Sequence, residues 1–184
     1  MDLRDFREFC IDAFKYIFTI FIVIFILVFV ATLQQVVGSS MSPNYKDNDI
    51  VLLNKFYYRF FDVKRFDIIS FEYDNTKYLI KRVIGLPGEQ IEYKNNKLYV
   101  DGKVIEEDFL ENDVITEDFS ILDLGYDVIP EDIYLVLGDN RGNSLDSREL
   151  GLIKKSDILG KANLRIWPIN KIGFVKWQNS TKIS

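Results

Sequence analysis

Three short segments of the 184-residue chain carry side chains that could perform hydrolytic chemistry. Residues 37–43 read VGSSMSP, and Ser40 is the candidate nucleophile in that run. Residues 78–89 read YLIKRVIGLPGE, and Lys81 is a candidate base. Residues 137–151 read LGDNRGNSLDSRELG, a polar run rich in groups that hydrogen-bond locally. Because a serine hydroxyl becomes nucleophilic when a neighbouring base removes its proton, a serine paired with a lysine is a sufficient catalytic unit.

The sequence has no histidine and a single cysteine, Cys10. The first count excludes a Ser-His-Asp triad, a Cys-His pair and a histidine-ligated zinc site. The second excludes an internal disulfide and a thiolate metal cluster. A hydrolytic base must therefore be Lys, Asp or Glu. No loop has the ligand spacing of an all-carboxylate metal site, so we expect neither a metal nor a cofactor.

The segment around Lys81 has the composition of a β-strand followed by a turn. Strand alternation would place Leu79 and Lys81 on one face and Ile80 and Arg82 on the other, so that one basic side chain faces inward. Burial disfavours the ammonium form and lowers the pKa of a lysine, which makes the neutral amine available as a base. The alternatives are an exposed charge on an edge strand for Lys81 and a serine-rich linker for residues 37–43.

An uncharged run of 18 residues, 16–33, precedes these segments. As a helix it would span roughly 27 Å, close to the hydrocarbon thickness of a bilayer. It is longer than the apolar core of a cleaved signal peptide, and no A-x-A site follows it. Basic residues precede the run and no charge directly follows it, which predicts a cytoplasmic segment 1–15 and a catalytic domain 34–184 outside the cell membrane.

The rest of the chain alternates short runs rich in Val, Ile, Phe and Tyr with turn residues. This pattern predicts a mainly β fold, a mostly antiparallel sheet or barrel. Asn95-Asn96 predicts one turn and Asp101-Gly102 predicts a two-residue hairpin. About residues 90–133 we expect a small, partly irregular β insertion, with the acidic stretch 106–127 exposed and with little core. The net charge of -5 argues against a nucleic-acid partner.

The motifs together resemble the type I signal peptidase family, in the small Gram-positive form with a single anchor. Residues 38–43 fit its Gly-x-Ser-Met-x-Pro motif, 81–89 fit its lysine motif, and 138–151 fit its late Gly-Asp-Asn-Arg motif. Order and spacing agree over nearly the whole chain. Asn48 stands where the family usually has glycine, and Asn44 stands where it usually has threonine.

The resemblance implies a membrane-bound serine endopeptidase that removes signal peptides from exported preproteins. Ser40 would attack the scissile carbonyl, and its backbone N–H would contribute to the oxyanion hole. Lys81 would be the general base, and Ser144 would hydrogen-bond its amine. Asp146 and Arg148 would form a structural ion pair. Where some members have a serine as oxyanion donor, this chain has Gly38.

The resemblance also implies substrate pockets for small residues at positions −1 and −3 of a preprotein. The residues that would line them are Met41, Tyr45, Val51, Leu79 and Ile80. The implied partners are preprotein signal peptides, the phospholipid membrane and the export machinery. The aromatic-basic run 55–61 either rests on the membrane surface or is strand core.

Three other functions remain open at this level. A self-cleaving repressor has the same dyad, but it carries a DNA-binding domain where this chain has an apolar run. A specialised processing enzyme for one pathway, such as that of pilus subunits, would have the same motifs. A catalytically inactive membrane-anchored binding module would not need both Ser40 and Lys81.

Overall fold

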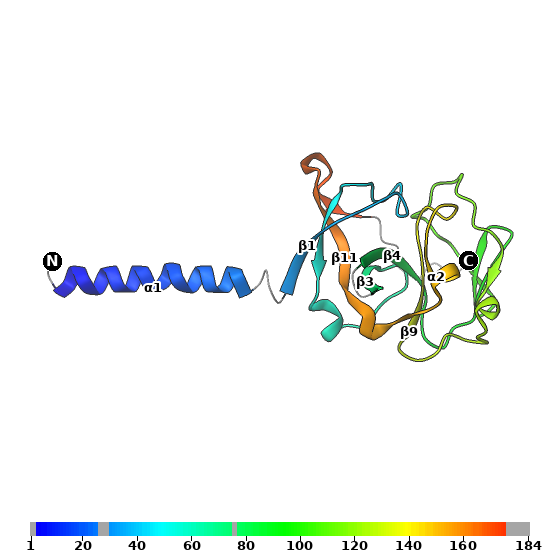
Figure 1. Ribbon diagram of the computed structural model, residues 1–184, viewed down its shortest axis with the longest axis horizontal. Helices are drawn as coiled ribbons and strands as arrows, with labels where there is room; N and C mark the ends of the chain where they lie inside the picture. Colours follow the sequence, from blue (N-terminus) through cyan, green and yellow to red (C-terminus); the bar gives the residue numbers. More distant parts are fainter. Residues whose placement is uncertain (1–2, 26–29, 75–76, 176–184) are drawn as a thin grey trace.

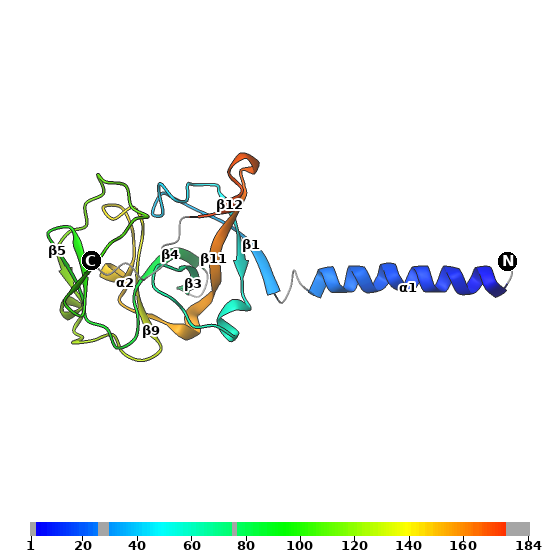
Figure 2. The ribbon, with the colours of Figure 1, turned by 180° about the vertical axis from the view of Figure 1, so that it is seen from behind.

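An N-terminal helix leads into two antiparallel β-sheets (Figure 1), in the computed structural model that describes residues 3–25, 30–74 and 77–175. Helix α1 comprises Leu3–Phe25. It extends away from the sheets in both views (Figures 1 and 2). Its apolar side chains are largely exposed, among them Phe14, Ile17 and Phe21.

The predicted span of residues 16–33 differs from the structure at both ends. The helix begins earlier, at Leu3, and residues 26–29 lie outside the described part of the chain. The predicted end at residue 33 is wrong, because 31–33 belong to strand β1 and pair with 52–54 of β2. Within the described ranges, no helix combines the length and the apolar character needed to cross a bilayer.

The larger sheet has eight strands and confirms the mostly antiparallel prediction, since every pairing in it is antiparallel. Its spatial order is β1 (Ala31–Gln35), β2 (Ile50–Asn54), β11 (Ile158–Trp167), β3 (Ile68–Tyr73), β4 (Lys77–Gly85), β9 (Ile133–Leu137) and β10 (Ile153–Lys154), with β12 (Gly173–Phe174) on β11. The short helices beside it are η2 (Tyr57–Arg59), α2 (Ser147–Leu150), η4 (Lys155–Asp157) and η5 (Ile169–Lys171).

The smaller sheet lies within the predicted insertion. Its order is β7 (Lys103–Ile105), β6 (Lys97–Val100), β5 (Ile91–Lys94) and β8 (Phe119–Ser120), followed by η3 (Ile121–Leu124). Asn95 and Asn96 join β5 to β6, and Asp101 and Gly102 join β6 to β7, all with positive φ. Two consecutive left-handed residues give the turn twist that a tight hairpin needs, so both turn predictions are confirmed.

A shared apolar core joins the two sheets. It combines Ile84 of β4 and Leu135 of β9 with Ile91 and Leu98 of the smaller sheet. The prediction that residues 106–127 are exposed with little core holds only in part, because most of these side chains are exposed but Phe109, Thr116 and Ile121 are buried. The acidic residues led to the prediction of an exposed segment. The apolar side chains Phe109 and Ile121 among them pack in the core that the two sheets share. Two further clusters fill the rest of the larger sheet's faces.

Candidate active site

Ser40 lies in a tight turn directly after strand β1. The turn begins at Gly38, whose φ of 87° is in the left-handed region that favours glycine. The backbone N–H of Gly38 donates to Asp47 Oδ1 at 2.8 Å. Two residues after Ser40, the N–H of Ser42 donates to the carbonyl of Ser39 at 3.0 Å. These bonds fix the backbone while leaving Ser40 partly exposed.

Asn48 supports the same turn indirectly, through Asp47. Its φ is 67°, so the asparagine that replaces the family's usual glycine adopts the left-handed conformation. Its side chain donates to Asp47 Oδ2 at 2.9 Å and accepts from Gln35 at 2.7 Å. The substitution therefore preserves the backbone and adds a side-chain support for Asp47.

Lys81 reaches the nucleophile from strand β4. Its Nζ lies 2.6 Å from Ser40 Oγ, within hydrogen-bonding distance. The side chain is buried, with 1% of its surface exposed. Burial lowers the pKa of Lys81 from 10.5 to about 8, although the negative charges of Asp146 and Asp139 oppose that shift. The geometry therefore pairs a hydroxyl with an amine that loses its proton only slightly above neutral pH.

Arg82 is buried as well, so the prediction that only one of the two basic side chains faces inward is wrong. Its guanidinium forms two hydrogen bonds to Asp139, of 2.8 and 2.6 Å, and both partners are fully buried. The far end of β4 is covered on both faces, from Ile80 to Gly85. Strand alternation sends Lys81 and Arg82 to opposite faces, and it does not say whether one of those faces meets solvent.

Asp146 and Arg148 form the predicted ion pair. Arg148 donates to the Asp146 carboxylate from Nε and from Nη2, both at 2.9 Å. The backbone N–H of Gly138 donates to Asp146 Oδ2 at 3.0 Å. Burial alone raises the pKa of Asp146, but the bonds from Arg148 and Gly138 outweigh it and leave the pKa below its usual value. Asp146 is therefore a fixed anion near Lys81.

Ser144 lies beside the dyad without the contact predicted for it. The expected hydrogen bond to Lys81 is not formed, although the Ser144 hydroxyl lies close enough to the Asp146 carboxylate to help lower the pKa of Asp146. Instead the hydroxyl packs against Gly138, where a side chain would collide with Ser144 and with the carbonyl of Ser40. The predicted supporting residue is thus close to the backbone of the nucleophile but makes no hydrogen bond to the base.

The five predicted pocket residues do not share one surface. Four of them, Met41, Tyr45, Val51 and Ile80, are buried in a single core cluster. Leu79 is only partly buried and packs against a different cluster. Tyr45 also donates its hydroxyl to the carbonyl of Ala162 at 2.5 Å. These apolar residues were assigned to pockets by resemblance, and in the structure most of them support the nucleophile turn from within.

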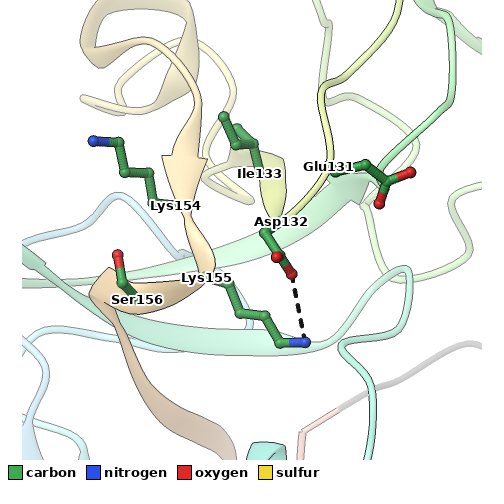
Figure 3. A pocket seen from close by; sticks show the side chains of 6 residues that line it. All are labelled: Glu131, Asp132, Ile133, Lys154, Lys155 and Ser156. Carbon is green, nitrogen blue, oxygen red and sulfur yellow. Dashed lines mark ion pairs between the residues drawn. The ribbon is translucent and has the colours of Figure 1, made fainter.

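A pocket elsewhere on the surface has no part in this arrangement. It lies where β9 and β10 meet, and its lining contains none of the predicted site residues (Figure 3). Lys155 Nζ and Asp132 Oδ1 form an exposed ion pair of 3.7 Å there. Among the described residues, no group of three or more His, Cys, Asp or Glu side chains is placed to hold a metal ion.

Several contributors to the site were missed from the sequence. Asp139 pairs with Arg82, and Asn44 donates to Asp139 Oδ2 at 2.9 Å. Asp139 lies inside a recognised motif, which was the available signal. Nothing in the sequence marked Glu107 or Phe109, whose contacts depend on how the smaller sheet packs.

Known proteins resemble the chain over the same region. Residues 10–167 match the family described as signal peptidase, peptidase S26. Signal peptidase I V of Bacillus subtilis is 45% identical over 134 residues, 68% of this chain and 80% of that protein. Signal peptidase IB of Staphylococcus aureus strain MRSA252 is 38% identical over 167 residues, 84% of this chain and 87% of that protein.

A solved structure agrees with the fold. The crystal structure of a signal peptidase I from Enterococcus faecalis V583 superposes with a TM-score of 0.50 at 36% identity, covering 55% of this chain and 97% of that chain. Together with the family match over most of the sequence, this likeness settles the relationship. The chain belongs to the signal peptidase family, peptidase S26, and is a serine endopeptidase.

Proposed function

We propose that this protein removes N-terminal signal peptides from exported preproteins, with Ser40 as nucleophile and Lys81 as general base. The observation that carries the proposal is the 2.6 Å approach of Lys81 Nζ to Ser40 Oγ in a buried setting. The names of the relatives, signal peptidase I, supply the substrate class.

The reaction follows from this geometry. Lys81 in its neutral form takes the Ser40 proton while Oγ bonds to the scissile carbonyl carbon, and the backbone N–H of Ser40 stabilises the oxyanion. The intermediate collapses, the peptide C–N bond breaks, and Lys81 gives its proton to the leaving amine. Water then attacks the acyl-enzyme ester with Lys81 as base again, which frees the signal peptide's carboxylate and restores Ser40.

Strand β4 offers a place for the substrate backbone. Within the described residues, β9 pairs with β4 only from Arg82 to Gly85, so the edge of residues 77–81 has no strand beside it on that side. A preprotein segment bound there in extended form would gain main-chain hydrogen bonds next to Lys81. Its −1 and −3 side chains would point to the same face, and the tight packing around the site favours small residues in both places.

The decisive experiment is cleavage of a generic preprotein by wild type and Lys81→Ala, with N-terminal sequencing of the mature product. We expect a single cut after an A-x-A-like sequence by wild type, and none by the variant. A substrate with −1 Ala→Phe should lose most of its kcat/KM through overpacking, whereas a change at −2 should matter little. Efficient cleavage of the −1 Phe substrate would contradict the proposed requirement for a small residue at −1.

We also propose attachment to the cell membrane through the apolar N-terminal segment that begins at Tyr16, with the catalytic domain outside. Support comes from the basic residues Arg4, Arg7 and Lys15 before this segment and the exposed apolar side chains of α1. Protease added to intact spheroplasts should digest the catalytic domain. Protection of that domain would rule out this orientation.

The run 55–61 is a candidate second contact with the membrane. It contains the short helix η2, and Phe60 and Phe61 expose 68% and 58% of their surface, so strand core is the wrong interpretation of these two residues. Exposed aromatic rings beside basic side chains favour a bilayer interface. In the domain lacking helix α1, Phe60→Ser with Phe61→Ser should weaken binding to anionic vesicles, and unchanged binding would remove this claim.

A further inference from the structure

One short segment that follows strand β7 of the smaller sheet lies close to the dyad. We propose that this segment, Glu107–Phe109, is a positioning element of the active site, because it holds the base strand, the nucleophile turn and the late loop at once. The proposal rests on the function proposed above. It makes the insertion a working part of the peptidase, although neither residue touches the reacting atoms.

The first contact is with the strand that carries the base. The Phe109 ring lies under the Arg82 guanidinium, with 3.9 Å from its carbon to the ring centroid, and only 2% of Phe109 is exposed. The guanidinium also bonds to Asp139 and to the carbonyl of Phe66. Phe109 therefore helps to hold Arg82 in place. Because Arg82 follows Lys81 directly on β4, this contact also limits movement of the backbone at Lys81.

The second contact is with the nucleophile turn. The carbonyl of Phe109 accepts a hydrogen bond from Asn44 Nδ2 at 2.9 Å, and the same amide nitrogen donates to Asp139 Oδ2 at 2.9 Å. The backbone carbonyl of Asn44 is itself held by Arg165 at 2.9 Å. Asn44 is thus a fixed bridge between the turn of Ser40 and the segment of Phe109.

The third contact is with the late loop. Glu107 Oε1 lies 2.6 Å from Arg141 Nη2 and accepts from the Tyr93 hydroxyl at 2.8 Å. Arg141 has 2% of its surface exposed, and its Nε donates to the carbonyl of Gly138 at 3.0 Å. Its own carbonyl accepts from Arg148 at 2.8 Å.

A displacement of Arg141 would therefore also displace Gly138, which contacts residues beside both Ser40 and Lys81. The N–H of Gly138 bonds to Asp146, the anion near Lys81, and Gly138 packs against Ser144 and the carbonyl of Ser40. The N–H of Asn140, next to Arg141, donates to the same Ser40 carbonyl at 3.0 Å. A small displacement is sufficient to matter, since a misplacement of about 1 Å can cost about 100-fold in rate.

The test compares four variants of the full chain in detergent with a preprotein substrate. Glu107→Gln removes the charge that holds Arg141, and Phe109→Leu removes the ring face under Arg82 while keeping most of the apolar volume. Their matched controls are Glu111→Gln, at an exposed acid of the same loop, and Phe119→Leu, at a partly buried ring on strand β8 of the smaller sheet. The measurements are the melting temperature, kcat, KM and the pH profile, taken well below the lowest melting temperature.

We expect kcat to fall roughly 10- to 100-fold in Glu107→Gln and Phe109→Leu, with KM within about twofold of wild type. The acidic limb of the profile should move to higher pH in Phe109→Leu, because a displaced Arg82 neutralises Asp139 less well and the negative charge of Asp139 raises the pKa of Lys81. Both controls should keep kcat within about twofold, since they leave all three contacts in place.

A purely structural role gives a different result. Lower melting temperatures with wild-type kcat and an unchanged pH profile would overturn the proposal, and so would equal losses in the controls. If Glu107→Gln does not yield folded protein, Phe109→Leu and Phe119→Leu decide by the same criteria. An inactive wild-type protein would instead contradict the proposed peptidase function. Failure of that function is therefore distinguishable from failure of the positioning role.

Discussion

Ser40 and Lys81, the two residues of the proposed dyad, lie 2.6 Å apart but differ in their surroundings. Ser40 lies on a turn with exposed neighbours Gly38 and Ser39, and it is itself partly exposed. Lys81 lies at the start of the doubly covered end of β4. The difference follows from their tasks: a nucleophile must be reached by a peptide, whereas a lysine base must be kept from water to lose its proton near neutral pH.

The supports of the two halves differ in the same way. The turn is held by polar contacts close to solvent, such as the Gly38 to Asp47 bond. The strand is held by the fully buried pair of Arg82 and Asp139. Buried charges are costly to separate and exposed bonds are not, so damage on the strand side should have larger consequences than damage on the turn side.

The largest effects should come from the dyad itself. Ser40→Ala and Lys81→Arg should each reduce turnover by several orders of magnitude, because the guanidinium of arginine stays charged and cannot accept the proton. Lys97→Arg, at an exposed lysine of the smaller sheet, is the matched control and should retain wild-type rates. Preprotein cleavage measures all three, and an active Lys81→Arg enzyme would exclude Lys81 as the base.

The next effect is the dependence of the reaction on pH. With the pKa of Lys81 at about 8, the lysine is protonated below that pH and cannot act as a base. We expect kcat/KM to rise about tenfold per pH unit on the acidic side and to level off above about pH 8. EDTA should leave the profile unchanged, and an EDTA loss that added metal restores would contradict the dyad.

The same shift has a consequence for stability. Between about pH 8 and 10.5 the unfolded chain keeps the Lys81 proton while the folded protein has lost it, so this group makes stability rise with pH in that window. Lys81→Met should remove this part of the rise and unfold at a higher temperature than wild type at pH 7. Thermal melts across the pH range check it, and identical slopes would contradict the buried lysine.

A smaller effect is expected from Asp146→Ala, which strands Arg148 beside the loop. Asp146 is fully buried, and breaking such a pair costs about 3–5 kcal/mol when burial is complete, so the melting temperature should fall together with activity. Lys155→Ala breaks the exposed pair with Asp132 and should cost less than about 1 kcal/mol. Full stability with lost activity in Asp146→Ala would give this carboxylate a direct chemical role.

The smallest effect should come from the turn side, through Asp47→Ala. Gly38 is exposed, so water replaces the lost acceptor, and the stability loss should be about 1 kcal/mol or less. We expect kcat to fall only several-fold, and Lys46→Ala next to it should leave kcat unchanged. A loss as large as that of Ser40→Ala would show that the turn is as dependent on its support as the strand.

The sequence by itself determined the features that depend on local pattern and motif order. Alternating apolar residues predicted antiparallel strands, and paired Asn and Asp-Gly residues predicted the two tight turns. The absence of histidine limited a hydrolytic base to Lys, Asp or Glu, and the resemblance of the three motifs to the signal peptidase family pointed to Ser40 and Lys81 as the proposed dyad. It also anticipated the pair of Asp146 and Arg148, which lie two residues apart.

Only the tertiary structure decided what covers each face of those strands. It buried Arg82 against the ring of Phe109, placed Asn44 between two loops, and put four of the five predicted pocket residues in the core. Periodicity states which side chains share a face, but it does not state whether a distant segment packs on that face. Glu107 and Arg141 are 34 positions apart, so their contact appears only once the smaller sheet is in place.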